Sequence, residues 1–392
     1  MYVSVYDENL NHLSNVTDTT HELTVRVYDN DTFSAEGICN EDINNAKIAV
    51  LNDDNGKYIY ACFTDGITSA KSKRTIKGLD FKTLWDTEIL LDYTKENSFD
   101  ARLSSIFAKV KEAVFETSDM SVCKIPVKVN IPLDETDTSE VYGTLEGTYK
   151  ITNAYKFLKC YLKYYEYNIE TSFDETAGEI IFDFVKCDES LSVDLNDFIY
   201  ELTTTSSATN KAVATIKYNV ETPQKDRDGK VIYTDIPKKD SDGNPIKDKD
   251  GNIEYIPKYA PRPENIAAKY YYRDRENNIV ESDEYGNIEK RLYPVKAKLF
   301  ESEYLSDAQY NAVYELANSR YVDNIIIDNN IVSDPVDFAI YPLYTKVSLY
   351  YGGRLYKTLP ISEKITKTGK DGTNTQIKLG FKKILLTEII KG

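Results

Sequence analysis

The residues that most often carry catalysis are scarce in this sequence. Its 392 residues include two histidines, His12 and His21, and both fall in a polar, turn-like N-terminal segment. A Ser-His-Asp or Cys-His arrangement would therefore have to be built from a loop with little supporting structure. The sequence contains no Gly-x-Ser-x-Gly, His-Glu-x-x-His, phosphate-binding glycine-rich loop or dinucleotide fingerprint. We therefore predict that the protein is not an enzyme and has no catalytic residue, no cofactor-binding residue and no cofactor.

Carboxylates are the one catalytic residue type in good supply, with 64 aspartates and glutamates. A glycosidase needs only two of them at the right separation, so the sequence leaves a glycan-hydrolysing role open. Exposed, solubilising charge is the ordinary reason for such residues, and we interpret Asp183 and Asp188 in this way.

Metal sites are not predicted either. The five cysteines are odd in number, scattered and never in Cys-x-x-Cys spacing, which indicates neither a disulfide framework nor a zinc site. They are Cys39, Cys62, Cys123, Cys160 and Cys187.

Three copies of an Asp-x-Asp-Gly sequence are the best candidates for calcium. They are Asp226-Arg-Asp-Gly229, Asp240-Ser-Asp-Gly243 and Asp248-Lys-Asp-Gly251. An EF-hand-type loop needs oxygen ligands at positions one, three and five and glycine at position six. Setting each glycine at position six places Gln224, Lys238 and Ile246 at position one, so the first carboxylate is missing each time. The common hairpin turn explains Asp-Gly better, and we predict a protruding β arm that binds no calcium tightly.

Charge and composition exclude further classes of function. The 48 lysines and arginines against 64 acidic residues give a net charge of −16, so sequence-specific nucleic-acid binding is not expected. An acidic wall would still let DNA slide past, although simple solubility explains the same charge. No apolar run approaches the roughly 20 residues of a membrane span, and the chain opens directly on strand-like residues, so we expect no leader. The 32 tyrosines fit either sugar-binding surfaces or coding bias.

Hydrophobic periodicity divides the chain into β and mixed regions. Alternating strands fill residues 1–92, with a hairpin turn at Asp53–Gly56. A helical stripe then covers Asp100–Phe115 behind a Ser98 or Asp100 cap. A second helix at Asn153–Tyr167 leads into an alternating strand at Gly178–Val185, which together indicate an α+β unit.

The second half of the chain returns to β texture around one helix. A strand is predicted at Ala212–Val220, before the Asp-Gly arm. Ser306-Asp-Ala-Gln309 is a capping box that opens a helix to about Arg320, and strands follow from Lys346 to the end.

One stretch near the start of the chain returns near its end. Lys73–Leu90 and Gln376–Ile390 both run from a short strand through one glycine, Gly78 or Gly380, to Phe-Lys and then Thr-Glu-Ile. Such self-similarity favours a duplicated β unit, with chance likeness of two amphipathic strands as the alternative.

The order of these elements resembles a known family. The segments that carry the resemblance are Tyr2-Val-Ser-Val-Tyr-Asp7, Arg74-Thr-Ile-Lys-Gly-Leu-Asp-Phe-Lys-Thr-Leu84 followed by the helix at Asp100, Ser306-Asp-Ala-Gln-Tyr310, and Lys346-Val-Ser-Leu349 with Ile377-Lys-Leu-Gly-Phe381. In this respect the chain resembles the tail hub proteins of long-tailed bacteriophages, the baseplate hub or tail-associated family that also occurs in contractile injection machines.

The resemblance implies a mainly β, multi-domain fold with α+β parts. It would consist of two tube-like β-barrel domains, an α+β domain and an inserted β-rich domain. The expected boundaries are residues 1–95 for the first tube-like domain, 96–190 for the α+β domain, 191–221 plus 324–392 for the second tube-like domain, and 222–323 for the inserted domain with its hairpin arm and helix.

The same resemblance implies a structural role in the virion. Three copies would form a tail or baseplate hub that connects the tail tube to the tip and leaves a central channel for DNA. The implied partners are a distal tail or tail tube protein, the tape measure protein and receptor-binding or spike proteins, with DNA only in non-specific transit. The protein would be made in the cytoplasm of the bacterial host and reside in the phage tail tip or baseplate. The alternative is a carbohydrate-binding or glycan-hydrolysing tail protein, which the abundant tyrosines and acids favour.

Overall fold

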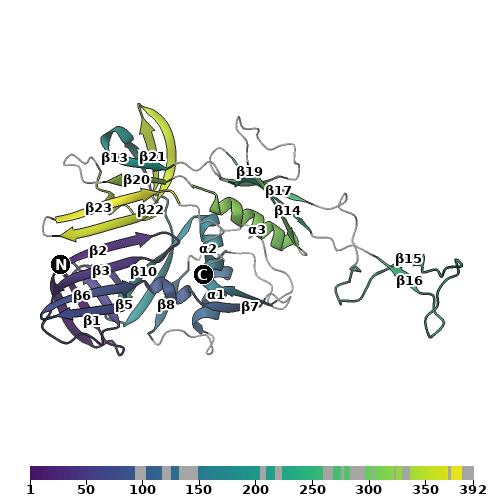
Figure 1. Cartoon of the computed structure of the whole chain (residues 1–392), viewed down its shortest axis with the longest axis horizontal. Helices are drawn as coiled ribbons and strands as arrows, with labels where there is room; N and C mark the ends of the chain where they lie inside the picture. The colour runs from purple at the N-terminus through teal and green to yellow at the C-terminus, as the bar shows by residue number, and fades with distance from the viewer. Residues whose placement is uncertain are drawn as a thin grey trace. The chain divides into compact units, whose positions relative to one another are not determined.

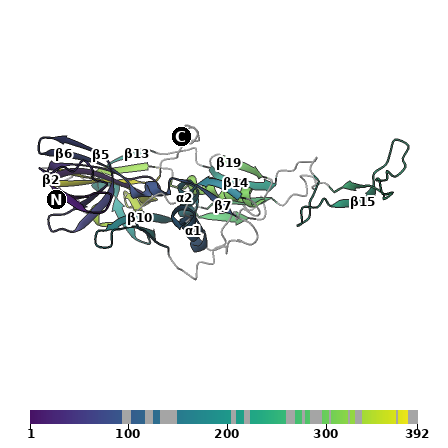
Figure 2. The same cartoon turned by 90° about the horizontal axis from the view of Figure 1, so that it is seen from below.

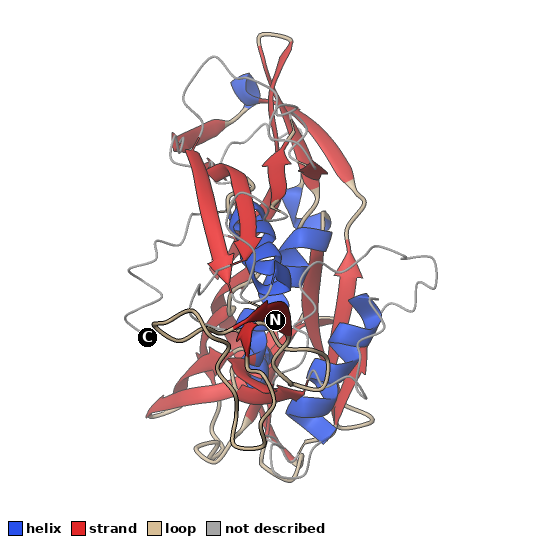
Figure 3. Cartoon of the chain, turned by 90° about the vertical axis from the view of Figure 1, so that its right-hand side faces the viewer, coloured by secondary structure: helices blue, strands red, loops and turns tan. Residues whose placement is uncertain are grey.

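The fold is mainly β, as the sequence predicts. The computed structural model describes residues 1–92, 103–116, 125–131, 149–203, 209–216, 223–258, 268–274, 278–282, 296–302, 305–321, 324–328, 336–369 and 372–381. The chain forms two compact units, one from Met1–Ala208 with Tyr314–Gly392 and the other from Thr209–Val313. Strands outnumber helices throughout (Figure 3). No helix in the described part of the chain combines the length and apolar character that crossing a membrane requires.

The N-terminal strands of the first unit close into a six-stranded barrel (Figure 1). In barrel order they are β1 (Tyr2–Tyr6), β4 (Ile48–Asn52), β5 (Tyr58–Ala70), β6 (Lys73–Leu79), β3 (Thr32–Ile38) and β2 (His12–Arg26). Pairing of β1 with β2 completes the ring, so none of the six has an edge free along its whole length. Inward-facing side chains such as Val3, Leu51 and Ile76 are fully buried and form one core.

The turn between β4 and β5 forms as predicted. Asp53 accepts hydrogen bonds at Oδ1 from the backbone N–H groups of Asn55 and Lys57, both at 2.8 Å. Gly56 has φ +79°, a conformation that glycine adopts without strain.

Strand β2 belongs to the barrel and also pairs with a strand from the last part of the chain. Its first part pairs with β1, and His21–Arg26 pairs with Glu363–Thr368 of β22 (Arg354–Gly369), while β3 lies on the other side. Both histidines lie in this strand, which corrects the prediction of a turn-like segment. The polar residues that suggested a turn are the outward-facing half of a long strand; His12 is exposed, whereas His21 is buried.

A second six-stranded set continues from β22. Its order is β12 (Ser190–Asp194), β21 (Lys346–Tyr351), β22, β23 (Gly372–Leu379), β20 (Asn324–Asp328) and β13 (Ile199–Thr203). These strands enclose a core of their own, which includes Phe338, Val347 and Ile377. The set and the barrel form one continuous sheet through the β2–β22 pairing.

An α+β layer completes the first unit. Helix α1 (Leu103–Lys111) continues as a π-helical turn at Glu112–Glu116, and helix α2 (Ala154–Tyr165) follows strand β9 (Tyr149–Asn153). The other strands of this layer are β7 (Glu88–Asp92), β8 (Val127–Asn130), β10 (Tyr167–Asp174) and β11 (Glu179–Lys186). Both helices and the strand at β11 were predicted, but the proposed caps Ser98 and Asp100 lie outside the described residues. Trp85, in the 3₁₀ helix η1 (Phe81–Trp85), is fully buried against the rings of Phe115 and Phe182.

The second unit contains a four-stranded sheet and most of a helix. The sheet order is β18 (Ile279–Ser282), β17 (Lys269–Arg273), β14 (Thr209–Ile216) and β19 (Lys296–Ser302), and α3 spans Leu305–Asn318. Helix α3 begins one residue before the predicted cap, Ser306, whose side chain lies outside the described residues.

The Asp-Gly segment is a narrow arm around the two-stranded ribbon β15 (Tyr233–Pro237) and β16 (Tyr255–Pro257) (Figure 2). In each of its three turns the first aspartate accepts two backbone hydrogen bonds at Oδ1, from residues two and four positions later. Every carboxylate at the start of a turn is therefore used to fix the loop, which agrees with the turn interpretation of Asp226, Asp240 and Asp248.

Candidate functional site: two polar junctions and an open sheet edge

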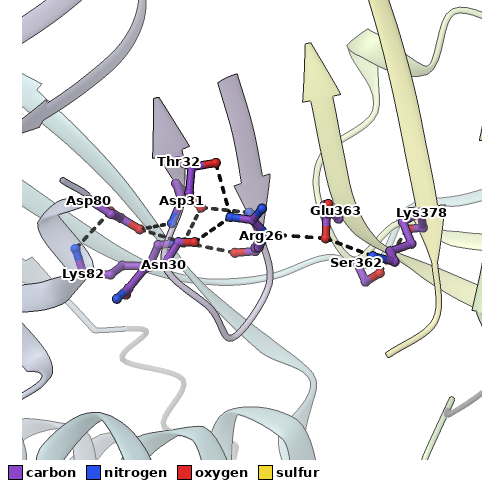
Figure 4. A network of polar contacts seen from close by, with 9 residues as sticks. All are labelled: Arg26, Asn30, Asp31, Thr32, Asp80, Lys82, Ser362, Glu363 and Lys378. Atoms are coloured by element: carbon purple, nitrogen blue, oxygen red, sulfur yellow. Dashed lines mark hydrogen bonds and ion pairs between the residues drawn. The ribbon is translucent and has the colours of Figure 1, made fainter. Parts of the chain in front are cut away.

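A buried group of three charged residues lies at one end of the barrel, beside the first residue of β3 and the last residue of β6 (Figure 4). Asp31 precedes β3, and Asp80 and Lys82 follow β6. Asp31 and Lys82 are 51 residues apart in the sequence, and the pairing of the barrel strands brings them together. Lys82 Nζ lies 2.8 Å from Asp31 Oδ1 and 3.3 Å from Asp80 Oδ2. Asp80 also accepts from the backbone N–H of Asp31 at 2.7 Å and from that of Lys82 at 3.0 Å.

Burial sets the protonation of this group. The side chain of Lys82 is 3 % exposed, that of Asp31 is 5 % exposed and that of Asp80 is 0 % exposed. Desolvation raises the pKa of Asp31 to about 7, although the charge of Lys82 opposes the rise. The pKa of Lys82 is also raised, because the attraction of the two carboxylates outweighs the effect of burial. Asp31 and Lys82 therefore both keep their protons to a higher pH than the same groups in water.

The network extends from the barrel to the second six-stranded set. Arg26, at the end of β2, donates from Nη1 to the carbonyl oxygen of Asn30 at 3.0 Å, and its Nε lies 3.4 Å from Glu363 Oε2. Glu363 in turn lies 3.4 Å from Lys378 Nζ of β23 (Figure 4). This chain of contacts crosses the β2–β22 pairing and aligns the two strand sets.

A second junction is built on Glu166, at the C-terminal end of α2. Its left-handed backbone, at φ +62°, ends the helix and turns the carboxylate toward the late strands. Lys346 Nζ lies 2.7 Å from Oε2, while Oε1 accepts from Tyr321 Oη at 3.0 Å and Arg320 Nη1 at 3.4 Å. Burial alone would raise the pKa of Glu166, but the hydrogen bond from Lys346 and the charge of Arg320 outweigh it and lower the pKa.

Aromatic rings surround this second junction. Tyr28, Tyr344 and Phe381 have ring centroids 5.3 to 6.0 Å apart. Tyr28 also donates from Oη to the carbonyl oxygen of Leu162 in α2 at 3.0 Å. Tyr28, Glu166, Tyr321 and Tyr344 all have positive φ, so four strained backbone positions from three parts of the fold meet here. The junction fixes the barrel, α2 and the second strand set to one another.

The second strand set differs from the barrel at its ends. Among the described strands, β12 pairs only with β21 and β13 only with β20, so each presents an unpaired edge. On β13, Ile199 is 64 % exposed, and Tyr200 and Leu202 are each more than a third exposed. An edge strand with exposed apolar side chains is a template for pairing with another chain.

Within the described part of the chain, the structure brings together no catalytic constellation from the candidates that the sequence offered. Among the residues that the structure describes, no group of three or more histidine, cysteine, aspartate or glutamate side chains could hold a metal ion. His21 is buried between β3 and β22, where burial lowers its pKa. Cys39 and Cys62 are buried and free.

Sequence reasoning missed both junctions. Lys82 stood in the repeated stretch, but a lysine is normally expected at the protein surface. The one available signal was Asp80, two residues earlier, in the position of a helix-capping aspartate. Nothing local pointed to Glu166, because its three partners lie about 155 to 180 residues later in the chain.

No family model and no curated protein matches the chain. Several solved structures resemble it over nearly its full length. The 43 kDa tail protein of prophage MuSo2 from Shewanella oneidensis has a TM-score of 0.48 and 13 % identity, covering 97 % of this chain and 98 % of that one. The prophage tail protein gp18 from Listeria monocytogenes has a TM-score of 0.46 and 11 % identity, covering 100 % and 98 %. An Escherichia coli type VI secretion component, with a TM-score of 0.36 and 6 % identity, covers 93 % and 76 %. The similar structures are thus phage tail proteins and a component of a related secretion machine.

Proposed function

We propose that the protein is a structural tail or baseplate hub of a bacteriophage, assembled as a homotrimer around a central channel. The observation that carries the proposal is the contrast between the two strand sets: one is a closed barrel, and the other ends in two edges that no described strand covers. The chain itself pairs the barrel with the second set through β2 and β22, so a continuous sheet can run from one set to the next.

Free edges explain why copies would associate. Unpaired strand edges with exposed apolar residues bind other strands unless they are covered, and rotational symmetry satisfies every such edge without open-ended growth. Three copies, each with two six-stranded sets, would place six sets around the axis. This agrees with the tube-like arrangement that the sequence resemblance implies.

The hub would act by holding other proteins and conducting DNA. Its partners would be a distal tail or tail tube protein, the tape measure protein and receptor-binding or spike proteins, and it would reside in the virion. With a net charge of −16, a channel lined by acids or neutral groups would let DNA pass without binding it. No enzymatic step is part of the proposal.

Molecular mass tests the assembly. We expect the purified protein to have three times the 44.8 kDa mass of one chain by sedimentation or mass photometry. Replacing Ile199 and Leu202 together by lysine places charge on the β13 edge and should shift the mass toward the monomer. The control is Ile340→Lys, which places a lysine at an apolar residue that is 72 % exposed and lies in a 3₁₀ helix rather than on a strand edge.

Two results would refute the proposal. One is a wild-type protein that stays monomeric at the highest concentration measured. The other is an assembled structure whose channel is lined mainly by lysine and arginine, since such a wall would hold DNA rather than conduct it. Turnover of a glycan substrate by the purified protein would favour the carbohydrate-directed alternative instead.

A further inference from the structure

The buried group Lys82, Asp31 and Asp80 has the composition and geometry of a self-reacting site. We propose that Lys82 Nζ forms an amide bond with the side-chain carboxyl carbon of Asp31, with release of one water molecule, and that Asp80 acts as the catalytic proton carrier. The product would be a covalent cross-link within one chain. This inference is independent of the tail function proposed above.

The reacting groups are already in contact. Lys82 Nζ lies 2.8 Å from Asp31 Oδ1, a hydrogen-bonded contact that holds the nitrogen beside the carboxyl group whose carbon it would attack. Asp80 Oδ2 lies 3.3 Å from the same nitrogen and can take a proton from it. The backbone N–H of Arg26 donates to Asp31 Oδ1 at 2.8 Å. This donor points at the oxygen that becomes negative when nitrogen attacks the carboxyl carbon.

Several bonds hold these groups in place before any reaction. The carbonyl oxygen of Arg26 accepts from Lys82 Nζ at 3.0 Å, so the lysine head is fixed from a third side. The carboxylate of Asp80 is held by the backbone N–H groups of Asp31 and Lys82. A fixed nucleophile, acid and electrophile gain the entropic advantage of an intramolecular reaction.

The site is dry enough to favour the amide. All three side chains are 5 % exposed or less, and Phe81 beside Lys82 is fully buried. With every group ionised, the three residues carry one excess negative charge in a poorly solvated space. Uptake of one proton removes that charge, and Asp31, whose pKa burial raises to about 7, is the carboxyl group that can take up this proton near neutral pH. A protonated carboxyl is the form that an amine can attack with loss of water.

The atoms and charges of the step balance. The starting state holds the ammonium of Lys82, the neutral acid of Asp31 and the carboxylate of Asp80. The ammonium passes one proton to Asp80, the C–N bond to Asp31 forms, and the carboxyl hydroxyl leaves as water with a second nitrogen proton relayed through Asp80. The products are a neutral amide, water and the neutral acid of Asp80. The reaction therefore removes two charges from a place where each charge costs desolvation energy.

The cross-link would staple the turn between β2 and β3 to the corner after β6. Those two points lie 51 residues apart in the chain and at the same end of the barrel. A covalent tie at this position would keep the ends of β3 and β6 together even when the surrounding hydrogen bonds open.

Mass spectrometry of the denatured full-length protein tests the proposal. We expect an intact mass lower than that of the sequence by one water molecule, and a branched peptide after digestion that contains both Asp31 and Lys82. Lys346 and Glu166 provide an internal control, since their atoms are as close, at 2.7 Å, but the lysine is 39 % exposed. That pair should yield separate peptides in the same digest.

Two variants separate the roles. Lys82→Arg keeps the positive charge but lacks the amine, so its mass should match its sequence. Asp80→Asn keeps the side-chain shape but cannot carry the proton, so the cross-linked fraction should fall at least tenfold at equal times after synthesis. Recovery of Asp31 and Lys82 in separate peptides from the wild-type protein would overturn the cross-link, and this measurement does not depend on whether the variants fold. A cross-linked Asp80→Asn protein formed at the wild-type rate would overturn the role of Asp80.

Discussion

Replacing Glu166 by glutamine should weaken the junction between α2 and the late strands. Glutamine keeps the size of the side chain and one oxygen acceptor, but it removes the charge that faces Lys346 and Arg320. The Glu166 and Arg320 side chains are 17 % and 8 % exposed. A hydrogen bond to a charged group in such a setting contributes about 1.5 to 3 kcal/mol, whereas the more exposed Lys346 pair contributes less than about 1 kcal/mol. We expect the free energy of unfolding to fall by about 2 kcal/mol at neutral pH.

The pH dependence gives a sharper test than the size of the loss. The pKa of Glu166 is lowered in the folded protein from an ordinary value of 4.5, so its ionised form stabilises the fold above that value. This stabilisation is lost as the pH falls through the lowered pKa, because the carboxyl then becomes protonated in both states. The difference between wild type and Glu166→Gln should therefore shrink from pH 7 toward about pH 3.

Urea denaturation followed by tryptophan fluorescence measures both effects. Trp85 is the single tryptophan. It lies at the end of η1 and is fully buried against the α+β layer, so its emission reports opening of this unit. The matched control is Asp188→Asn, which removes the same charge from an exposed carboxylate and should change stability by less than about 0.5 kcal/mol. An equal penalty for Glu166→Gln at both pH values, or none at neutral pH, would refute the ion-pair explanation.

Three further predictions concern packing and the arm. Gly78→Ala should cost about 1 to 3 kcal/mol in a urea titration, because the added Cβ would lie 2.4 Å from a neighbouring sulfur atom, whereas Gly66→Ala has open space and should be nearly neutral. Trp85→Ala should cost about 3 to 5 kcal/mol, and Trp85→Phe should cost clearly less, with circular dichroism as the readout. Calorimetry with calcium should show no micromolar binding; a binding signal that disappears in Asp228→Ala and Asp250→Ala would contradict this prediction.

Local periodicity was enough to predict most elements of this fold. The buried stripe of α2 recurs at helical spacing, and β11 alternates strictly, so both were recognisable without any knowledge of their neighbours. The turn at Asp53–Gly56 was equally local, because its geometry depends on residue types that tolerate positive φ. Such features are encoded within a few residues and need no tertiary context.

The long strand β2 shows where this reasoning fails. Its outward-facing side chains are polar because one face meets solvent, and a run such as Asp18-Thr-Thr-His21 then imitates a turn. Asp18 has a positive φ and lies at the irregularity in the β2–β3 register between Thr17 and Thr20. Pairing with β3 and with β22, a strand more than 330 residues away, makes this segment the strand that joins the barrel to the second strand set.

The buried charges were also beyond the reach of sequence. A lysine is expected at the surface, and its burial beside two aspartates depends on barrel closure, which brings residues 31 and 82 together. In the composition of the chain these residues contribute only to the net charge, which says nothing about where they lie. The domain boundaries from the sequence stay a prediction, although β14, expected in the second tube-like domain, pairs within the four-stranded sheet of the other unit.

The repeated stretch gains a different meaning from the structure. Its two strands, β6 and β23, each lie between two partners within a six-stranded set, which is the placement that a duplicated unit would share. The glycines of the two stretches, however, are required for different structural reasons. Gly78 leaves room for the sulfur of Cys62, whereas Gly380 adopts φ +77° and ends its strand in a conformation that other residues avoid. A common glycine with two separate physical causes is weak evidence for common origin, so the stronger argument for duplication is the matching position of the strands rather than the matching letters of the sequence.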